Sequence, residues 1–246
     1  MTDTANDPTA KLVTPDAEGW STGASVVDFI LGNAVSVSYY LNLIISLTGF
    51  DPIETVQNYF GGDWQKLLES AKAIEHLAEY NTAYSDAVEA AMKDLETSWQ
   101  GNAATSAQDF FATLNEAVDA QVDPLYKIAN ATAAFAWASF GVAQTVQALI
   151  FELGDRAAQW ALTQAAAAAA AVTGVGAAAA AALEAVCNAI LLVMLSNVAK
   201  TIKHLGTLLA ASQALLGTIT GLLGTAMEFQ MPSLGGGSYD HPGVFG

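Results

Sequence analysis

Apolar positions recur at helical spacing along most of the chain and predict an all-α protein. Between Asp63 and Ser98 the pattern is that of one long amphipathic helix, with a stripe at Leu67, Ala71, Ile74, Leu77, Tyr84, Val88, Leu95 and Trp99. A second stripe follows at Ala107, Phe110, Phe111, Leu114, Val118, Val122, Leu125, Ile128, Thr132, Phe135, Phe140, Val146, Leu149 and Leu153. Two stripes that meet at a short interruption predict a long antiparallel helical hairpin over residues 63–153.

The interruption is Trp99-Gln100-Gly101, which we expect to form the turn of the hairpin. Gly101 supplies the backbone freedom that a sharp reversal needs. The indole of Trp99 is expected to fold across the ends of both helices and cover the apolar seam. Trp99 and Gly101 are therefore predicted to determine the fold, without a chemical role. Asp123-Pro124 lies inside the second stripe and predicts a kink or a fresh helix start, because proline disrupts a helix interior.

The region before the hairpin, residues 24–60, is predicted to form short apolar helices. Its apolar stretch from Ala24 to Phe50 is about as long as a membrane span, but Asp28, Asn33 and Asn42 interrupt it. Asp51-Pro52 then opens a further short helix, with aspartate as the N-cap and proline at the first helical position.

Residues 154–228 are predicted to form an alanine-rich, apolar helical pair that extends the hairpin into an elongated bundle. From Ala165 to Leu195 the only charged residue is Glu184, and Gly174-Val175-Gly176 divides the alanine run at an expected bend. Two interpretations of this region stay open. The helices pack against each other or against another copy, or they insert in a membrane.

The two ends of the chain differ from the body. Residues 1–23 are polar, acidic and dotted with proline, which predicts a disordered or loosely attached lead. They lack the basic and apolar regions of a cleaved signal peptide. Residues 229–246 are rich in glycine and proline and predict a flexible tail.

The charge excludes one large class of partner. Twenty-four acidic and eight basic residues give a formal net charge of −16, with Arg156 as the only arginine. Nucleic-acid binding relies on basic residues that neutralise phosphates, so nucleic acid is not an expected partner. Only 13% of residues are charged, against about 25% in ordinary globular domains. Either much of the surface is therefore built from alanine, serine, threonine, asparagine and glutamine, or part of it meets a partner or lipid.

The residues that carry chemistry are scattered. His76, His204 and His241 lie on separate predicted elements, without a serine or cysteine constellation for a catalytic triad. The glycines at 235–237 lack the lysine and helix of a phosphate-binding loop. We therefore predict no catalytic, cofactor-binding or metal-binding residues, and no enzyme. Cys187, the only cysteine, is either a small buried side chain or the site of an intermolecular disulfide.

The Trp99-Gln100-Gly101 turn between two amphipathic helices, followed by NAATSAQDFFATL, resembles the Trp-x-Gly (WXG) superfamily of type VII (ESX) secretion substrates. It is similar to the long actinobacterial members, which are secretion-associated proteins and amino-terminal domains of toxins. Gly62-Asp63-Trp64 before the hairpin and the alanine-rich region after it match the same pattern, so the resemblance covers residues 24–227. The spacing of the superfamily's export signal occurs only at Tyr59 to Asp63, ahead of the hairpin, where we interpret it as a helix junction.

The resemblance implies a non-enzymatic protein that is secreted or held at the cell envelope without a cleaved signal peptide. Its expected partners are a small WXG-type helical protein and the type VII secretion machinery, with a homo-oligomer and a membrane left open. Two alternatives remain. One is a membrane-inserting or pore-forming effector that uses the apolar block 165–195. The other is a phage or surface structural protein in which the turn motif is a coincidence.

Overall fold

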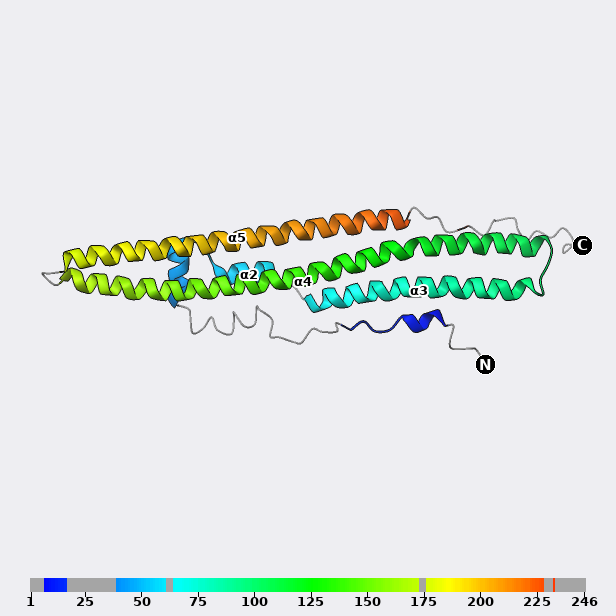
Figure 1. Cartoon of the computed structure of the whole chain (residues 1–246), viewed down its shortest axis with the longest axis horizontal. Helices are drawn as coiled ribbons and strands as arrows, with labels where there is room; N and C mark the ends of the chain where they lie inside the picture. The colour runs from blue at the N-terminus through cyan, green and yellow to red at the C-terminus, as the bar shows by residue number, and fades with distance from the viewer. Residues whose placement is uncertain (1–6, 17–38, 61–63, 173–175, 228–231, 233–246) are drawn as a thin grey trace, which may run out of the picture. The chain divides into compact units, whose positions relative to one another are not determined.

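The structure, a computed structural model, describes residues 7–16, 39–60, 64–172, 176–227 and 232. These residues form helices and no strand, as the sequence predicted (Figure 1). The elements are the 3-10 helix η2 (Pro8–Lys11), α2 (Pro52–Phe60), α3 (Trp64–Glu96), α4 (Asn102–Val172) and α5 (Ala177–Met227). A short apolar helix, Tyr39–Thr48, precedes α2. The chain divides into two compact units, and α4 and α5 each contribute to both.

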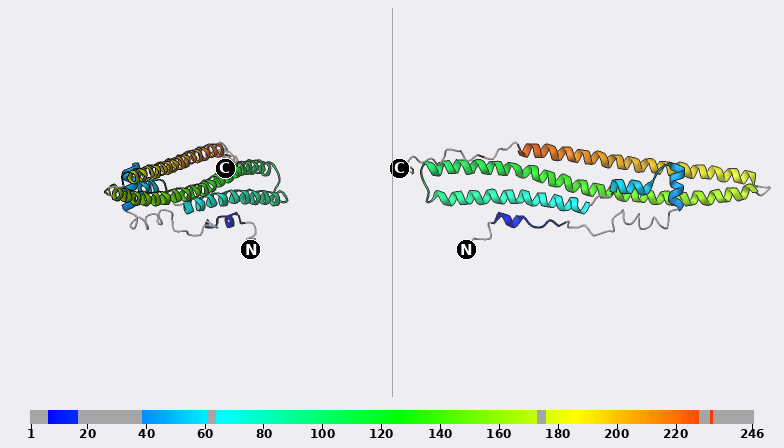
Figure 2. Two further views of the ribbon diagram at one scale, coloured as in Figure 1. Left: turned by 60° about the vertical axis from the view of Figure 1, so that its left-hand side comes forward. Right: turned by 180° about the vertical axis from the view of Figure 1, so that it is seen from behind.

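The first unit contains the hairpin, made by α3 from Leu67 onward and by α4 as far as Ala133. The two helices lie side by side and run in opposite directions in all three ribbon views (Figures 1 and 2). The predicted hairpin is therefore present. Its inner face contains small side chains, since α3 buries Ala71, Ala78 and Ser85 at steps of seven residues, together with Leu68 and Asn81. Small residues allow two helices to approach closely.

The face of α3 that packs inward differs from the one predicted. Leu77, Leu95 and Trp99 of the predicted stripe are exposed, and Tyr84 and Val88 are only half-buried. On α4, by contrast, every residue of the predicted stripe is buried or half-buried. Ala71, which the predicted stripe includes, is buried, and Leu67 and Ile74 are half-buried. The helix is thus correct, and its predicted inner face is correct only in part.

The second helix of the hairpin does not end where the sequence suggested. α4 runs without interruption from Asn102 to Val172 and has Pro124 in its interior. Of the two outcomes expected at Asp123-Pro124, the fresh helix start is therefore wrong, and the kink stays a prediction. The boundary predicted between residues 153 and 154 also falls inside α4, and the compact units change at Ala133 and Ala134 instead.

The second unit packs α4 from Ala134 against α5 up to Ala214, together with Tyr39–Thr48 and α2. The buried residues of both long helices recur every seven positions, which is the repeat of a coiled coil. One such series is Ala136, Ala143, Ile150 and Ala157 on α4, and another is Ala180, Cys187, Met194, Thr201 and Leu208 on α5. The predicted alanine-rich pair is thus a packed helix pair. The bend expected at 174–176 falls largely outside the described residues, between the ends of α4 and α5.

One apolar cluster joins the Tyr39–Thr48 helix and Phe50 to this pair. Ile44 and Phe50 pack with Leu153 and Ala157 of α4 and with Met194 and Val198 of α5. Gly49, with a φ of 69°, ends the first short helix, and its N–H donates to the Ile45 carbonyl. The Asp51 carboxylate then accepts from the N–H groups of Ile53 and Glu54 at 2.9 and 3.0 Å. The N-cap predicted from Asp51-Pro52 is confirmed.

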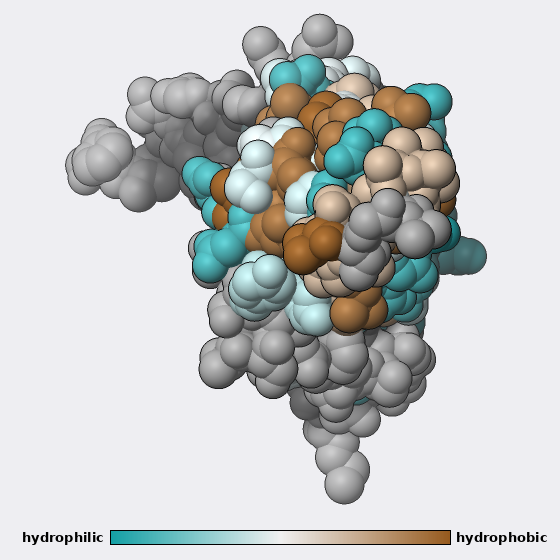
Figure 3. Space-filling view, turned by 90° about the vertical axis from the view of Figure 1, so that its left-hand side faces the viewer, coloured by the Kyte–Doolittle hydropathy of each residue, from teal (hydrophilic) through white to brown (hydrophobic). Residues whose placement is uncertain are grey.

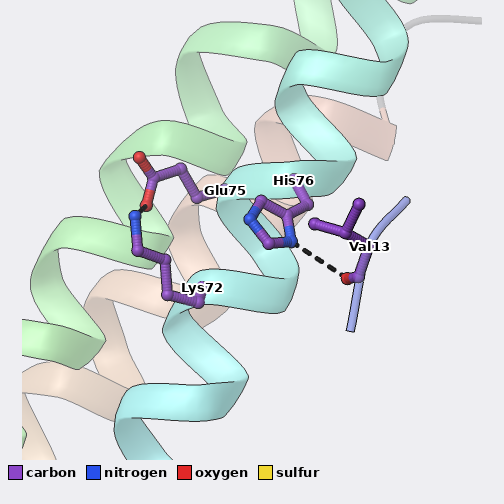
Figure 4. A network of polar contacts seen from close by, with 4 residues as sticks. All are labelled: Val13, Lys72, Glu75 and His76. Atoms are coloured by element: carbon purple, nitrogen blue, oxygen red, sulfur yellow. Dashed lines mark hydrogen bonds and ion pairs between the residues drawn. The ribbon is translucent and has the colours of Figure 1, made fainter. Parts of the chain in front are cut away.

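Part of the predicted loose lead lies against the first unit. Asp7 caps η2 by accepting from the N–H of Thr9 at 2.9 Å. Farther along, the carbonyl of Val13 lies 3.2 Å from Nδ1 of His76 on α3 (Figure 4). Residues 8–13 therefore have a defined conformation. His76 contacts this segment through its side chain. The predicted tail, 229–246, lies outside the described residues except for Pro232.

Candidate interaction surfaces

The turn of the hairpin is formed by the residues between the end of α3 at Glu96 and the start of α4 at Asn102. The N–H of Trp99 still donates to the Leu95 carbonyl at 2.8 Å, so the chain keeps helical bonding almost to the reversal. Gly101 has a φ of 101°, a conformation that L side chains rarely adopt, and its carbonyl accepts the N–H of Thr105 at 3.1 Å. The prediction of a turn at 99–101 that depends on Gly101 is confirmed.

The predicted role of Trp99 as a cover for the seam is wrong, because 41% of the residue is exposed. Trp99 follows Leu95 by four residues, and positions four apart share one face of a helix. Leu95 is itself 43% exposed, so this face points away from the packed side of α3. The indole that does close a packing contact is Trp64, in the second unit. Only 8% of Trp64 is exposed, and its ring meets Phe140 edge to face with centroids 6.0 Å apart.

Trp99 belongs to an apolar surface that runs along α3. We name the α3 stripe as the set Leu77, Tyr84, Val88, Leu95 and Trp99. Its members are separated by seven, four, seven and four residues, which places them on one side of the helix. The sequence analysis found this set and assigned it to the interior of the hairpin. The structure leaves three of the five members exposed.

A shallow cleft of about 400 Å³ lies near the turn, between α3 and α4. It is lined by Glu89, Met92, Lys93, Glu96, Gln108, Phe111, Ala112 and Asn115. Gln108 donates to Glu96 at 3.1 Å, and the Asn115 side-chain amide donates to the Ser85 carbonyl at 3.2 Å. The Asn115 Oδ1 atom is buried and has no hydrogen-bond partner. The lining contains no serine, cysteine or histidine, so it holds no Ser-His or Cys-His pair.

The titratable groups are dispersed in the parts of the chain that the structure describes. No group of three histidine, cysteine, aspartate or glutamate side chains there lies close enough to hold a metal ion. The ion pairs join neighbours along one helix, such as Lys72 with Glu75 at 2.8 Å (Figure 4). Exposed pairs of this kind contribute little to stability.

Cys187 faces the α4–α5 contact and is 2% exposed. Burial, with a smaller contribution from the charge of Glu184, raises the pKa of its thiol. The interpretation of Cys187 as a small buried side chain is confirmed. An intermolecular disulfide at Cys187 would require the two helices to separate.

Helix α5 exposes an extensive apolar surface. Two helices, Asn102–Val172 and Ala177–Thr225, are long and apolar enough to cross a membrane by length and composition. Only 28% and 17% of their most apolar windows are buried, whereas the core helix of a soluble protein is mostly buried. Figure 3 views the end at which α4 passes into α5, where apolar residues, in brown, reach the surface. Such a surface is typical of a site that meets another molecule.

The block 165–195, which the sequence analysis considered as a membrane insert, is not one helix. It contains the end of α4 at Val172 and the first part of α5 from Ala177.

A scan of the chain against models of known protein families finds no match, and searches of curated proteins and of solved structures find none either.

Proposed function

We propose that this protein is a non-enzymatic helical substrate of a type VII (ESX) secretion system, which leaves the cell together with a small helical partner. The observation that carries this proposal is the exposed α3 stripe beside a Trp-x-Gly turn. A hairpin folds by burying its inner face, and here that face is lined by Ala71, Ala78 and Ser85. The exposed members of the α3 stripe, Leu77, Leu95 and Trp99, are not needed for that contact, so they are available to another protein.

The partner that suits the α3 stripe is a second helical hairpin. The members of the stripe are spaced by seven, four, seven and four residues, and those within α3, from Leu77 to Leu95, span about 27 Å of helix, which matches the apolar seam of another helix. A partner hairpin laid on it would complete a four-helix bundle. Trp99 lies at the turn end of this surface and is the large aromatic anchor that protein interfaces favour.

Export is tested by expressing the tagged chain in an actinobacterial host with an intact or an inactivated type VII system. We expect the chain in the culture filtrate or cell envelope only when the membrane ATPase of the system is active, with a cytosolic enzyme as the lysis control. A chain that stays in the cytosol of the intact host contradicts the proposal.

Partner binding is tested by co-expressing the chain with a small WXG-type protein encoded beside it. We expect Leu95→Glu to abolish co-purification, because it places a charge in the middle of the apolar contact. The matched control is Leu162→Glu on α4, at a residue that is 72% exposed and lies outside the α3 stripe. Equal recovery of the partner with both variants would exclude the α3 stripe as its binding surface.

A second candidate function is a membrane-inserting effector, favoured by the two long apolar helices. From Leu205 to Met227, α5 carries no charged residue, which makes this segment a better insertion candidate than 165–195. Flotation with liposomes at neutral and mildly acidic pH tests it, because acid neutralises part of the −16 charge. Absence of lipid binding at both pH values excludes it.

A further inference from the structure

The amino-terminal segment 7–16 lies along α3 on the side away from α4 (Figures 1 and 2). The segment and this part of the hairpin belong to the same compact unit. A polar contact joins them, because Nδ1 of His76 lies 3.2 Å from the Val13 carbonyl, 63 positions away in the sequence (Figure 4). A carbonyl oxygen only accepts hydrogen bonds, so the ring nitrogen is the donor. The segment is therefore docked on the outside of the hairpin.

The face of α3 on that side is partly covered. We name the outer strip as His76, Tyr80, Ala83 and Ala87, all of which are half-buried. They are spaced by four, three and four residues, so they share one face of the helix. Each lies two residues from Ala78 or Ser85 of the inner face, which is about 160° away round the helix. Contact with α4 cannot cover this face, whereas segment 7–16 lies on it.

Segment 7–16 has a shape of its own but a shallow attachment. The Asp7 carboxylate accepts from the N–H of Thr9 at 2.9 Å, and the N–H of Leu12 donates to the Thr9 carbonyl at 3.0 Å. Pro8 and Pro15, whose φ is fixed by the ring, are half-buried. Leu12, by contrast, is 51% exposed. The segment thus loses little conformational entropy on docking and buries little apolar surface, so another molecule can displace it.

The outer strip adjoins the α3 stripe. Tyr80 belongs to the outer strip and Tyr84 to the α3 stripe, and their ring centroids are 6.1 Å apart. From the contact at His76, the docked chain continues as η2 towards the carboxyl end of α3, past this pair of rings (Figure 1). A helix with its side chains is about 10–12 Å wide, so one laid on the α3 stripe reaches across Tyr84 to Tyr80. Segment 7–16 and such a helix therefore compete for the same space.

We propose that residues 7–16 form an autoinhibitory strap, which docks on the outer strip and hinders a helical partner from binding the adjoining α3 stripe. The proposal rests on the proposed function for the identity of that partner. A partner binds only the molecules in which the strap has left, so its apparent affinity is reduced by the fraction that is released. Removing the strap contact should therefore tighten binding without adding any contact to the partner.

Docking of the strap is tested without a partner, by NMR of the full-length chain with a nitroxide spin label. The label is attached at Thr14→Cys in a Cys187→Ala background. We expect it to broaden the amide signals around His76 and to leave those around Leu95, about 29 Å farther along α3, unchanged. His76→Ala should weaken the broadening. Sharp signals around His76 in the labelled parent would show that the segment is not docked and would overturn the proposal.

Inhibition is tested by the affinity of the full-length chain for the small WXG-type protein encoded beside it, measured by calorimetry. We expect about three- to tenfold tighter binding for His76→Ala, and for a chain in which alternating glycine and serine replace residues 7–16. His204→Ala, which removes a histidine from α5, is the matched control and should bind like the wild type. Saturating partner should also abolish the broadening around His76 in the labelled chain.

The outcomes separate this proposal from the proposed function. Equal affinities of the wild type and the two strap variants, with the partner bound, overturn the strap and leave the proposed function standing. Broadening around His76 that persists in the partner complex does the same, because the strap then stays docked beside the partner. If the partner binds neither the wild type nor any variant, the proposed function and the inhibition fail together. None of these measurements depends on export.

Discussion

Replacing Leu153 with alanine removes three carbon atoms from the apolar cluster that joins α4 and α5 to the Tyr39–Thr48 helix. Leu153 is fully buried and lies with Ile44 and Met194, which are equally inaccessible. The lost transfer free energy is about 2.4 kcal/mol, at about 0.8 kcal/mol for each carbon. The cavity that remains raises the total, because neighbours on long helices cannot collapse fully into it. We expect a cost of about 3–4 kcal/mol, within the range of roughly 2–5 kcal/mol for buried leucines.

Leu162→Ala on the same helix is the matched control. Leu162 is 72% exposed, so the same substitution removes little buried surface and leaves no cavity. Alanine is also the better helix former, and we expect a net change within about 0.5 kcal/mol. Urea unfolding, monitored by circular dichroism, measures the free energy of unfolding of both variants. A shift of the midpoint that is the same for the two variants would refute the assignment of Leu153 to the core.

Three further predictions concern single residues. Gly101→Ala should destabilise the protein by about 1–2 kcal/mol, because alanine is strained at positive φ. Gly141→Ala within α4 should stabilise it by about 0.4–1 kcal/mol. Thermal unfolding should therefore show a lower melting temperature for the first variant and a higher one for the second. The Cys187 thiol should react with a maleimide at pH 8 many times more slowly in the native protein than in urea, since burial raises its pKa and blocks access; equal rates would contradict its burial. A non-reducing gel of freshly purified protein should show no Cys187-linked dimer.

The sequence was sufficient for features that depend on local chemistry. The cap at Asp51, the turn at Gly101 and the existence of the two long helices follow from residue types with strong backbone preferences. Such preferences act over a few residues and do not require knowledge of the rest of the fold. The wrong predictions concern Pro124 and Trp99, where distant contacts decide the result.

Pro124 has no N–H to donate, yet α4 continues through it. The residue is buried, and its neighbours Ile128 and Ala129 are buried as well. Packing of this face of α4 offsets the free energy lost by placing proline inside a helix.

For Trp99 the error has a different origin. A stripe of large apolar residues shows that one face of a helix meets something, but it does not show whether that is the same chain or another. Alanine and serine at seven-residue steps were the signal for the inner face of α3.

The most direct test of the proposed function is the export of Trp99→Ala, measured on the same preparations as its stability. Because 41% of Trp99 is exposed, the substitution should cost about 1–2 kcal/mol, less than the roughly 3–5 kcal/mol of a buried indole such as Trp64. Export should nevertheless fall to a small fraction of the wild-type amount. Trp137 on α4 is 47% exposed, and the Trp137→Ala variant should be exported normally. Normal export of Trp99→Ala, or a loss of stability as large as that of Trp64→Ala, would contradict the role of Trp99 as an exposed recognition residue.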